Sequence, residues 1–539
     1  MSAFSTIERW LLAGIIVLLL LAAFLNLGDF PMNSDGGLRS LTAMEMVLGD
    51  DYIVPKQNGN LYYRKPPLFN WAIVGAHSIF GDWSNFTIRF PVALSLLLWG
   101  LSIAVVLRKS MGTRNAVLVA LISITGGHML FESSRYGRID MLYSWMIWAI
   151  FMAVHFFYER KQWWPLFLVA YGLAGISYLT KGLPTVVFMG FTLMGWFFLN
   201  RNWKRFFSIQ HVAGGALFLA MVGSYYWAYE NRMPGKLELL FEALWTDSNE
   251  RTAAHFDFGK LIGHLALFPV KLLYEILPWS VLAIAWVRKG WWQEVKNTPL
   301  LKFCSVVFVA NIVIYWISPG TNTRYLLMFF PLISVLLVHF AEARALPLHS
   351  RIIGITFRVI LLLGVVAVWA FPFIPEFTDA PNVLVKCALI SAAFAGTALL
   401  AFRQPKATVM LMVVGVLLAR IAFNWILTPT MAPISKDKPY QIGSEAMAQI
   451  ADGEPFYVLR SATINTDVSA YITRWRNEVL LRKYKGEIEN DTFFLIDEHQ
   501  HLRLSEKGVE WDEYHTFIQR SGKTRVHLVK FKNYPEVME

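Results

Sequence analysis

Charged residues are scarce in this chain of 539 residues. Asp, Glu, Lys and Arg together make up 16% of it, whereas soluble domains carry about 25%. Hydrophobic residues account for 55%. The run over residues 11–27 approaches the roughly 18 apolar residues that predict a transmembrane helix, and many similar runs follow it. This composition excludes a soluble enzyme, a nucleic-acid-binding module and a disordered chain.

Cysteine is rarer still. Cys304 and Cys387 both fall inside apolar segments, which argues against a disulfide framework. The chain also lacks internal repeats and low-complexity tracts. Residues 1–27 carry an apolar stretch longer than that of a typical signal peptide and no clear small-residue cleavage site. We therefore interpret them as a retained first helix.

The apolar runs predict an integral membrane all-α protein with about thirteen transmembrane helices. We place these helices near residues 10–28, 90–107, 115–131, 140–157, 165–179, 183–199, 211–229, 270–287, 301–318, 325–343, 352–373, 383–402 and 407–427. Residues 68–80 are apolar but too short to span, which favours a position along the membrane interface.

The net charge of +11 reports the orientation of these helices rather than a nucleic-acid partner. Lys and Arg gather in alternate loops, such as 108–114, 201–205 and 344–358, and are few in the loops between them. Cytoplasmic loops of membrane proteins carry such an excess. We therefore expect the N-terminus in the cytoplasm and, after an odd number of spans, the C-terminus outside. The long loops at about 29–89 and 230–269 then lie outside, where we expect them to cover a site.

Residues 434–539 differ in composition from the rest of the chain. They hold 15 Lys and Arg against 17 Asp and Glu, a net of −2, which leaves +13 for the remainder. Residues 455–459, 492–496 and 524–531 are typical of strands, and 467–476 of a helix. We predict a transmembrane domain over 1–430 and a small extracytoplasmic α/β domain over 434–539.

Asp35 follows the first predicted span, in the segment Asn33-Ser34-Asp35-Gly36-Gly37. Ser, Asp and Asn favour the N-cap position, so this aspartate could simply cap the next helix. The alternative is a carboxylate that acts as a general base at the outer membrane surface.

Two adjacent cations, Arg64 and Lys65, precede Pro66-Pro67 and an apolar helix. Proline suits the start of a helix. The pair could be a basic membrane anchor within an aromatic belt, or rigidly aimed cations that bind a phosphate. The residues alone favour neither.

Further charged residues stand at the ends of predicted spans. Asp140 lies at the entry of an apolar span, where a carboxylate is costly unless paired and is a functional candidate. Its structural alternative is a pair with Arg135 or Arg138. Lys181, between two short spans, either reaches the interface or faces an anionic ligand.

The turn at Arg324 and Tyr325 leads into another span. These two residues are candidates for a functional role, and the structural alternative is that they anchor the helix at the membrane interface. Arg251 belongs to the polar segment 245–258, which also holds a histidine and acids. The spacing of these residues matches no strong metal signature. We therefore expect no metal and no cofactor.

The predicted topology brings these residues to one side of the membrane. Asp35, Lys65, Asp140, Lys181, Arg251, Arg324 and Tyr325 all map to the outer face. Carboxylates and cations at one membrane face suit an anionic, membrane-embedded substrate with a reacting centre. A lipid-linked phosphosugar fits, because its phosphate needs cations, its tail needs apolar grooves and its transfer needs a base.

The motifs resemble those of the GT-C glycosyltransferases of the aminoarabinose-transferase and protein O-mannosyltransferase group. The shared elements occur in the family's order over roughly residues 1–430: an acidic residue after the first helix, Lys65-Pro66-Pro67-Leu68, Arg135-x-Gly137-x-x-Asp140, Thr180-Lys181-Gly182 and the Arg324-Tyr325 turn before Phe330-Pro331-Leu332. Thirteen helices and an outer C-terminal domain are also typical of the group.

The resemblance implies roles for individual residues. Asp35 would be the catalytic carboxylate, and Lys65 and Arg251 would lie near the donor phosphate. Asp140 and Lys181 would be further residues of the outer cavity, and Tyr325 would approach the phosphate. Substrate binding by Arg64 and Arg324 completes the set of candidate residues. The donor in such relatives is a polyprenyl-phosphate sugar.

The chain departs from the family pattern at three places. Gly36 follows Asp35 where a glutamate is usual, Arg64 stands where a glutamate often precedes Lys-Pro-Pro, and Asn249-Glu250 stand where a histidine tends to occur. These departures leave the sugar unassigned. The acceptor is equally open between lipid A or lipopolysaccharide, another envelope glycan and a protein.

The expected function is transfer of a sugar from a polyprenyl phosphate to an extracytoplasmic acceptor, by inverting single displacement, in the bacterial inner membrane. The alternative is a transporter or flippase that uses Asp140 and Lys181, although transporters commonly show internal repeats. A non-catalytic scaffold whose outer domain binds a partner is the third possibility. The expected partners are membrane lipids, the lipid-linked donor and the acceptor.

Overall fold

The structure of the chain is a computed structural model. It describes residues 4–534 apart from 33, 250–256, 379, 487, 489–490 and 520–523. Within these residues, ten helices are long and apolar enough to cross a membrane, and two bent helix pairs raise the number to twelve. The chain is thus a multi-pass membrane protein, and the fold class predicted from the sequence is confirmed.

Each of the thirteen predicted segments overlaps an apolar element of the structure. The ten long candidates are Thr6–Phe24 (α1), Asn85–Met111 (α4), Asp140–Glu159 (α7), Trp163–Lys181 (α8), Trp203–Arg232 (α10, Trp203–Phe206, and α11, Ile209–Arg232), Pro299–Trp316 (α15), Thr323–Glu342 (η4, Thr323–Phe329, and α16, Phe330–Val338), Pro347–Phe373 (with α17, Pro347–Ala367), Val383–Arg403 (α18) and Pro405–Met431 (α19, Thr408–Ala422, and α20, Thr428–Met431). The shorter helices are α9 (Pro184–Leu199), α12 (Leu237–Asn249) and α14 (Trp291–Asn297).

Two predicted spans are bent rather than straight. Helix α5 (Thr113–Ile124) and the segment Gly127–Arg135, which begins with α6 (Gly127–Phe131), meet at 58°. Helix α13 (Phe258–Glu275) and the 3₁₀ segment Trp279–Trp286 meet at 113°, so the span predicted over 270–287 is not one helix. Pro278 stands at this break, and proline lacks a backbone N–H and disfavours a helical residue before it.

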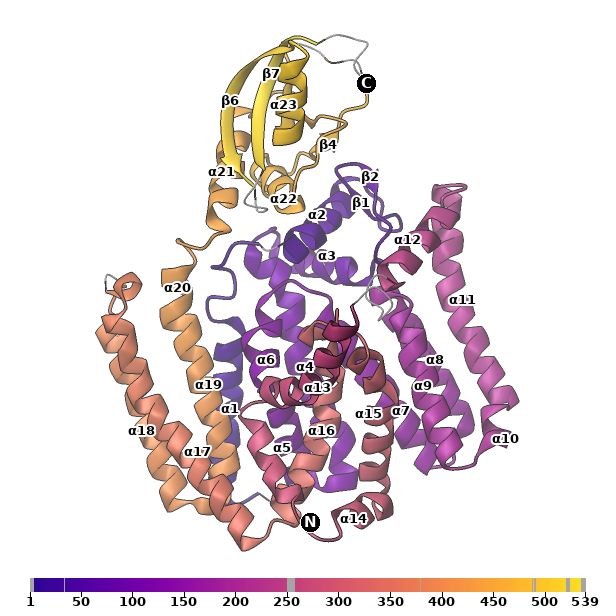
Figure 1. Cartoon of the computed structure of the whole chain (residues 1–539), viewed down its shortest axis with the longest axis vertical. Coiled ribbons are helices and arrows are strands. Elements are labelled where there is room, and N and C mark those ends of the chain that lie inside the picture. Colours follow the sequence, from indigo (N-terminus) through magenta and orange to yellow (C-terminus); the bar gives the residue numbers. More distant parts are fainter. Residues whose placement is uncertain are drawn as a thin grey trace.

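The most central span carries two of the predicted site residues, Arg324 and Tyr325. In Thr323–Glu342, 83% of the apolar window is buried inside the protein, and Arg324 lies at its start. Helices α17 and α18 flank one side of the bundle, and α8, α9 and α11 flank the other (Figure 1). The site therefore begins where the middle of the bundle meets the layer above it.

That layer consists of short elements from the first long loop. They are α2 (Ser34–Leu48), the two-stranded hairpin β1 (Lys56–Gln57) and β2 (Asn60–Leu61), and α3 (Leu68–Phe80). Helix α3 follows Pro66-Pro67, as expected from proline at a helix start, and ends at Gly81, whose φ of +71° is the left-handed conformation glycine allows. Figure 1 shows α2 and α3 between the bundle and the C-terminal part.

The C-terminal part is a mixed sheet with its own apolar core. The strands, in sheet order, are β4 (Arg482–Lys483), β3 (Phe456–Val458), β5 (Phe493–Asp497), β7 (Arg525–Asn533) and β6 (Glu510–Ile518). The helices are α21 (Lys438–Ile450), α22 (Thr466–Trp475) and α23 (Glu498–Glu506). Strands β3, β5 and β7 and helix α22 coincide with the elements predicted from the sequence. No sequence pattern predicted β4, β6, α21 or α23.

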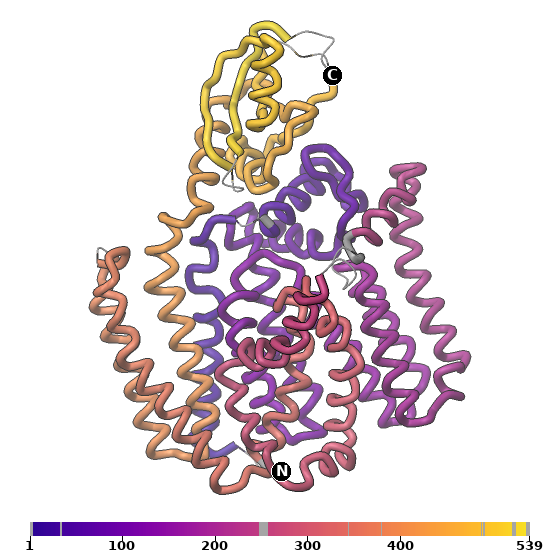
Figure 2. Tube along the Cα trace, viewed as in Figure 1, coloured from indigo at the N-terminus to yellow at the C-terminus, as the bar shows by residue number. Residues whose placement is uncertain are grey.

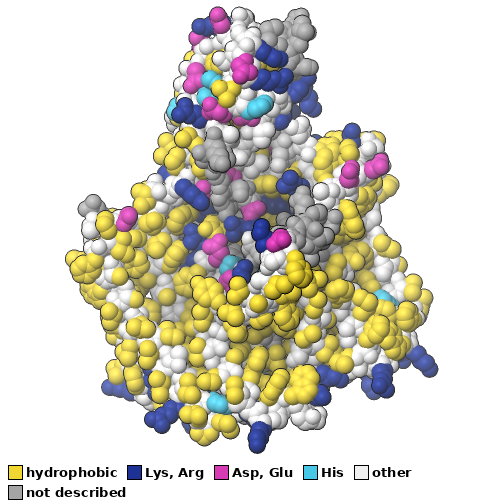
Figure 3. Space-filling view, viewed as in Figure 1, with side chains coloured by type: hydrophobic (Ala, Val, Ile, Leu, Met, Phe, Trp, Pro, Cys, Tyr) yellow, Lys and Arg dark blue, Asp and Glu magenta, His cyan; other side chains and the backbone are white. Residues whose placement is uncertain are grey.

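The two ends of the helical bundle carry different charges. The first described residues lie at the end away from the C-terminal domain (Figure 2). Apolar side chains form a broad belt, Lys and Arg gather at the N-terminal end, and both signs of charge occur at the other end (Figure 3). At the N-terminal end, Arg114 at the start of α5 lies 2.7 Å from Glu8 and 2.5 Å from Glu342.

Candidate active site beneath the C-terminal domain

Asp35 lies inside the first turn of α2, so it does not precede the helix as an N-cap would. Its Oδ2 accepts a hydrogen bond from the Arg324 guanidinium at 2.9 Å and lies 3.2 Å from Nε of Arg138. Among the described residues, both ion pairs of this carboxylate use Oδ2. The side chain remains 44% exposed. The carboxylate is therefore fixed in position by one oxygen and open on the other.

Asp140, at the start of α7, is the buried member of the same network. Only 5% of it is exposed. Its Oδ1 accepts a hydrogen bond from Lys181 Nζ at 2.6 Å, and its Oδ2 lies 3.4 Å from Nε of Arg324. The structural alternative of a direct pair with Arg135 or Arg138 is thus not what the structure has. Instead, Lys181 at the end of α8 compensates the buried charge, which is costly if left alone.

Arg324 joins the two carboxylates, because its guanidinium contacts both Asp35 and Asp140. It stands where the η4 turn leads into the central helix, so the bundle itself fixes its backbone. The neighbouring Tyr325 is buried, and Lys181 Nζ lies 4.1 Å from the centre of its ring. The predicted residues Asp35, Asp140, Lys181, Arg324 and Tyr325 therefore form one connected cluster.

A second ion pair supports this cluster, and the sequence analysis missed it. His128 Nδ1 lies 3.0 Å from Glu275, and the other oxygen of Glu275 accepts a hydrogen bond from Thr323 at 2.8 Å. Thr323 directly precedes Arg324. The pair links both bent helix pairs to the η4 turn. A histidine and a glutamate at the ends of apolar runs were the available signal.

Arg64 and Lys65 lie outside the ion-paired cluster. Arg64 is exposed, and Lys65 lines a small pocket with Tyr63, Tyr226 and Leu244. The residues that the structure describes include no ion pair between either cation and Asp35. A contact one turn along α2 connects the two regions, since the Arg39 guanidinium lies 3.5 Å from the hydroxyl of Tyr62. Arg251 lies outside the described residues.

Helix α2 also carries a carboxyl group near the C-terminal domain. Glu45 is buried, and its Oε2 accepts a hydrogen bond from the backbone N–H of Gly59 at 3.1 Å. Burial raises the pKa of Glu45 to about 7, against the opposing effects of backbone N–H groups and of the cations Arg482 and Lys56. The helix that holds Asp35 is therefore coupled to strand β4 at its far end.

The C-terminal domain packs directly on the helix that carries Asp35. Asp467 of α22 lies against Gly37 of α2, so closely that a side chain at this glycine would meet the Asp467 backbone. The backbone N–H of Met32 donates a buried hydrogen bond of 2.7 Å to the hydroxyl of Tyr471. The position of α2 is thus set by contacts from above and below.

Comparison with known proteins places this geometry in a structural context. The structure of ArnT from Cupriavidus metallidurans bound to undecaprenyl phosphate superposes with a TM-score of 0.68 at 16% identity, over 96% of this chain and 97% of that one. The apo structure of the same protein gives a TM-score of 0.69 at 17% identity, over 97% and 98% of the two chains. The chain has the GT-C fold. Its match to ArnT includes the C-terminal domain, since almost the whole length of both chains is covered.

Sequence comparisons agree with this fold. Residues 64–227 match the family described as dolichyl-phosphate-mannose-protein mannosyltransferase. This range begins at Arg64 and includes Asp140 and Lys181. The fold expected from the resemblance is therefore confirmed, and the sequence match supports the likeness to proteins of the ArnT and mannosyltransferase type.

Curated relatives share part of their length with this GT-C chain. The undecaprenyl phosphate-alpha-4-amino-4-deoxy-L-arabinose arabinosyl transferase of Edwardsiella ictaluri is 25% identical over 59% of this chain and 57% of its own length. The corresponding transferase 2 of Proteus mirabilis is also 25% identical, over 65% of this chain and 64% of its own length. The matched region thus spans about three-fifths of these relatives.

Proposed function

We propose that the chain is a membrane glycosyltransferase that moves a sugar from a polyprenyl-phosphate donor to an acceptor outside the cytoplasm. The observation that carries this proposal is the Asp35 carboxylate. It is half-exposed at the outer end of the bundle, and two guanidinium groups hold one of its oxygens. The resemblance to ArnT and to the mannosyltransferases supports the same assignment.

In the proposed reaction, Asp35 acts on the acceptor. Its outward oxygen accepts the proton of the attacking hydroxyl, and the acceptor oxygen then bonds to the anomeric carbon. The bond between that carbon and the phosphate oxygen breaks, and the electron pair leaves with the phosphate. Because attack and departure occur on opposite faces, the anomeric configuration inverts.

The leaving lipid phosphate is already an anion, so it needs stabilising cations more than a general acid. The cations Arg138 and Arg324 already neutralise Asp35 and Asp140. On the resemblance, we assign the phosphate to Lys65 and Arg251, with Arg64 as a further candidate. Lys181 and Tyr325 act on the substrate indirectly, by holding Asp140 and the turn that bears Arg324. No metal or cofactor takes part in this proposal.

The names of the relatives indicate the first donor to test. Both bacterial transferases are named for an undecaprenyl-phosphate aminoarabinose donor, and the ArnT structure contains undecaprenyl phosphate. We therefore propose undecaprenyl phosphate as the lipid carrier. The acceptor is lipid A, another envelope glycan or a protein.

Release of undecaprenyl phosphate by the purified protein tests this function. The assay combines the protein in detergent, the undecaprenyl-phosphate aminoarabinose donor and lipid A, and follows product by mass spectrometry. Asp35→Asn should lower turnover by about 10²–10⁴-fold, the usual contribution of a general base. Asp50→Asn is the matched control. Asp50 is an exposed aspartate two residues after the end of α2, and asparagine also accepts its φ of +47°.

Near-normal turnover by Asp35→Asn would contradict the assignment of the base. If the wild-type protein moves lipid across vesicles but releases no phosphate, the transporter or flippase considered from the sequence is correct instead. Comparison of surface glycans and glycoproteins with and without the gene identifies the sugar and the acceptor if they differ from those of the relatives.

For the orientation, we propose that the N-terminus is cytoplasmic and that the C-terminal domain and the active site face the periplasm of the bacterial inner membrane. Arg114 and Glu8 pair at the end of the bundle where α5 and α1 begin, and the Asp35 cluster lies at the opposite end. The Lys and Arg side chains gather at the end that holds Arg114 (Figure 3). The positive-inside rule makes that end cytoplasmic. An alkaline phosphatase fused after residue 539 should be active, and an inactive fusion would reverse the orientation.

A further inference from the structure

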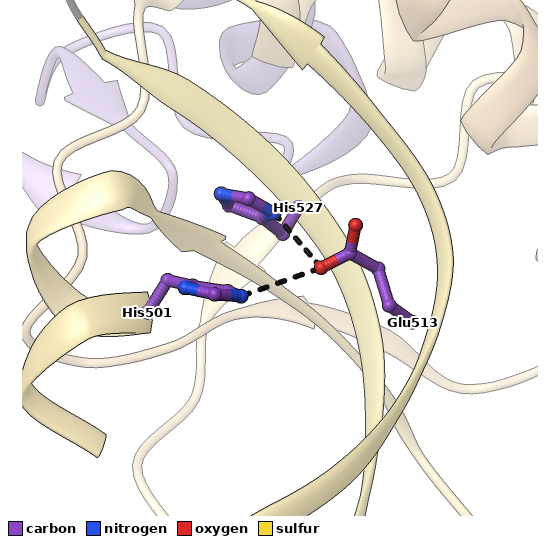
Figure 4. A group of neighbouring side chains, drawn as sticks. All are labelled: His501, Glu513 and His527. Carbon is purple, nitrogen blue, oxygen red and sulfur yellow. Dashed lines mark hydrogen bonds and ion pairs between the residues drawn. The ribbon is translucent and has the colours of Figure 1, made fainter. Parts of the chain in front are cut away.

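Two histidines and a glutamate meet on one face of the C-terminal sheet, far from the cluster around Asp35. His501 comes from α23, Glu513 from β6 and His527 from β7 (Figure 4). The Oε2 atom of Glu513 lies 3.0 Å from Nδ1 of His527 and 3.5 Å from Nε2 of His501. One ligand atom from each residue lies within 4.8 Å of the other two.

The sheet register explains why these side chains converge. Glu513 of β6 stands opposite Val529 of β7, and His527 is two residues from Val529 on the same strand. Residues two apart in a strand share a face, so Glu513 and His527 point to the same side. The register shifts immediately after Glu513, and such irregularities often re-aim a side chain.

Helix α23 supplies the third member. It follows β5 directly and begins at Asp497, whose side chain accepts a hydrogen bond from the backbone N–H of Gln500. This cap holds the first turn against the sheet. The ring of His501 then lies 4.2 Å from that of His527, nearly parallel, and 5.0 Å from that of Trp511.

The histidines are incompletely hydrogen-bonded for their burial. His527 is only 3% exposed. Within the described residues, His527 Nε2 and His501 Nδ1 are buried without a hydrogen-bond partner. Glu498 Oε2 lies 3.6 Å from His527 Nε2, on the side of the ring away from Glu513. At this distance the two atoms make no hydrogen bond, but a small rotation of Glu498 would give His527 the carboxylate partner that metal-binding histidines usually have.

The distances fit a zinc ion. Nitrogen and oxygen ligands stand roughly 2.0–2.2 Å from zinc in a tetrahedron, which separates them by about 3.3 Å. The two separations from Glu513 Oε2, 3.0 and 3.5 Å, bracket that value. The third separation, between the histidines, is at most 4.8 Å, and the stacked rings must turn toward each other when the ion binds. The side chains of Glu513 and His501 are 35% and 27% exposed, so an ion can enter from solvent. Three protein ligands also leave a fourth position for water.

We propose that His501, Glu513 and His527 bind one zinc ion that fastens α23 to strands β6 and β7. Glu498 orients His527 from outside the coordination sphere. The site belongs to the outer domain, is separate from the proposed transferase site and does not depend on that function. An ion here would stabilise the sheet edge formed by β6. The same domain packs on α2 through helix α22.

Metal analysis of the full-length protein tests this site. The protein in detergent is stripped with EDTA, incubated with zinc, desalted and analysed for bound metal, and cobalt is added separately to record the visible absorption of a tetrahedral complex. We expect one zinc per chain in the wild-type protein. His501→Ala and Glu513→Gln should lose it, whereas His499→Ala, an exposed histidine of the same helix, should keep it.

Folding and affinity measurements distinguish loss of zinc binding from loss of folding. Circular dichroism of the metal-free proteins shows that each variant is folded, and zinc should raise the unfolding temperature of the wild-type chain but not of Glu513→Gln. Glu498→Gln should weaken zinc binding by about 10–100-fold in competition with a chromogenic chelator. A wild-type chain that binds no zinc, or equal zinc content in His501→Ala and His499→Ala, would overturn the proposal. In that case the trio is an ion-paired and stacked cluster only.

Discussion

Gly37→Ala is a small change with a large expected effect, because Gly37 lies where α22 crosses α2. A Cβ atom at this position would stand 2.6 Å from Cα and 2.8 Å from the backbone N of Asp467. Carbon atoms pack at about 3.5–4.0 Å. Backbone atoms cannot rotate away as a side chain can, so the two helices must separate by about 1 Å. Asp35 is two residues from this contact and would move with α2.

Two effects of the substitution oppose each other in stability. Overpacking typically costs about 1–3 kcal/mol, while alanine in place of glycine inside a helix stabilises it by roughly 0.5–1 kcal/mol. We expect a net loss of about 1–2 kcal/mol in the free energy of unfolding. The effect on sugar transfer should be larger, because a misplacement of about 1 Å in an active site can lower the rate about 10²-fold.

Thermal unfolding and the undecaprenyl phosphate release assay measure the two effects separately. Gly75→Ala is the matched control, since Gly75 lies in α3 and a Cβ there meets nothing within 4 Å. This control should keep wild-type turnover and unfold at the same or a higher temperature. If Gly37→Ala also keeps wild-type turnover, then contact with the C-terminal domain does not position Asp35, and the reasoning fails.

Three further changes test other charged groups. Lys181→Ala should cost about 3 kcal/mol of stability, the low end for breaking a buried ion pair, because Arg324 still faces Asp140; chemical denaturation in detergent measures it. Arg114→Ala leaves two carboxylates unpaired at the N-terminal end and should cost about 3–5 kcal/mol by the same measurement. Glu45, with its pKa raised from 4.5 to about 7, favours the folded state below pH 4.5, and this contribution disappears as pH rises to about 7. The stability of Glu45→Gln relative to wild type should therefore rise by about 3 kcal/mol over that interval, and a constant difference would contradict the buried, protonated carboxyl.

The local character of the sequence accounts for the predictions that were confirmed. Apolar runs identify membrane helices because every backbone polar group in a bilayer must be satisfied within its own segment. Short runs of β-branched and aromatic residues likewise identified β3, β5 and β7. Two loops lie on the same side of the membrane when an even number of spans separates them. Counting spans therefore predicted one face for Asp35, Asp140, Lys181 and Arg324.

Within that face, the sequence did not decide which side chains touch. Asp140 is near Arg135 and Arg138 along the chain, yet its partners are Lys181 and Arg324. Arg135 instead lies over the rings of Phe30 and Phe423. Its place is set by the packing of α19 and the first loop, which no local pattern encodes.

Composition and periodicity by themselves predicted a membrane-embedded helical bundle, a C-terminal α/β domain and a set of charged residues at one end of the bundle. Only the tertiary structure decided that Arg324 bridges two carboxylates and that His501, Glu513 and His527 meet. The physical reason is range. Hydrophobic burial and turn formation act within a segment, whereas these contacts join residues from distant segments and exist only once the helices and strands have packed.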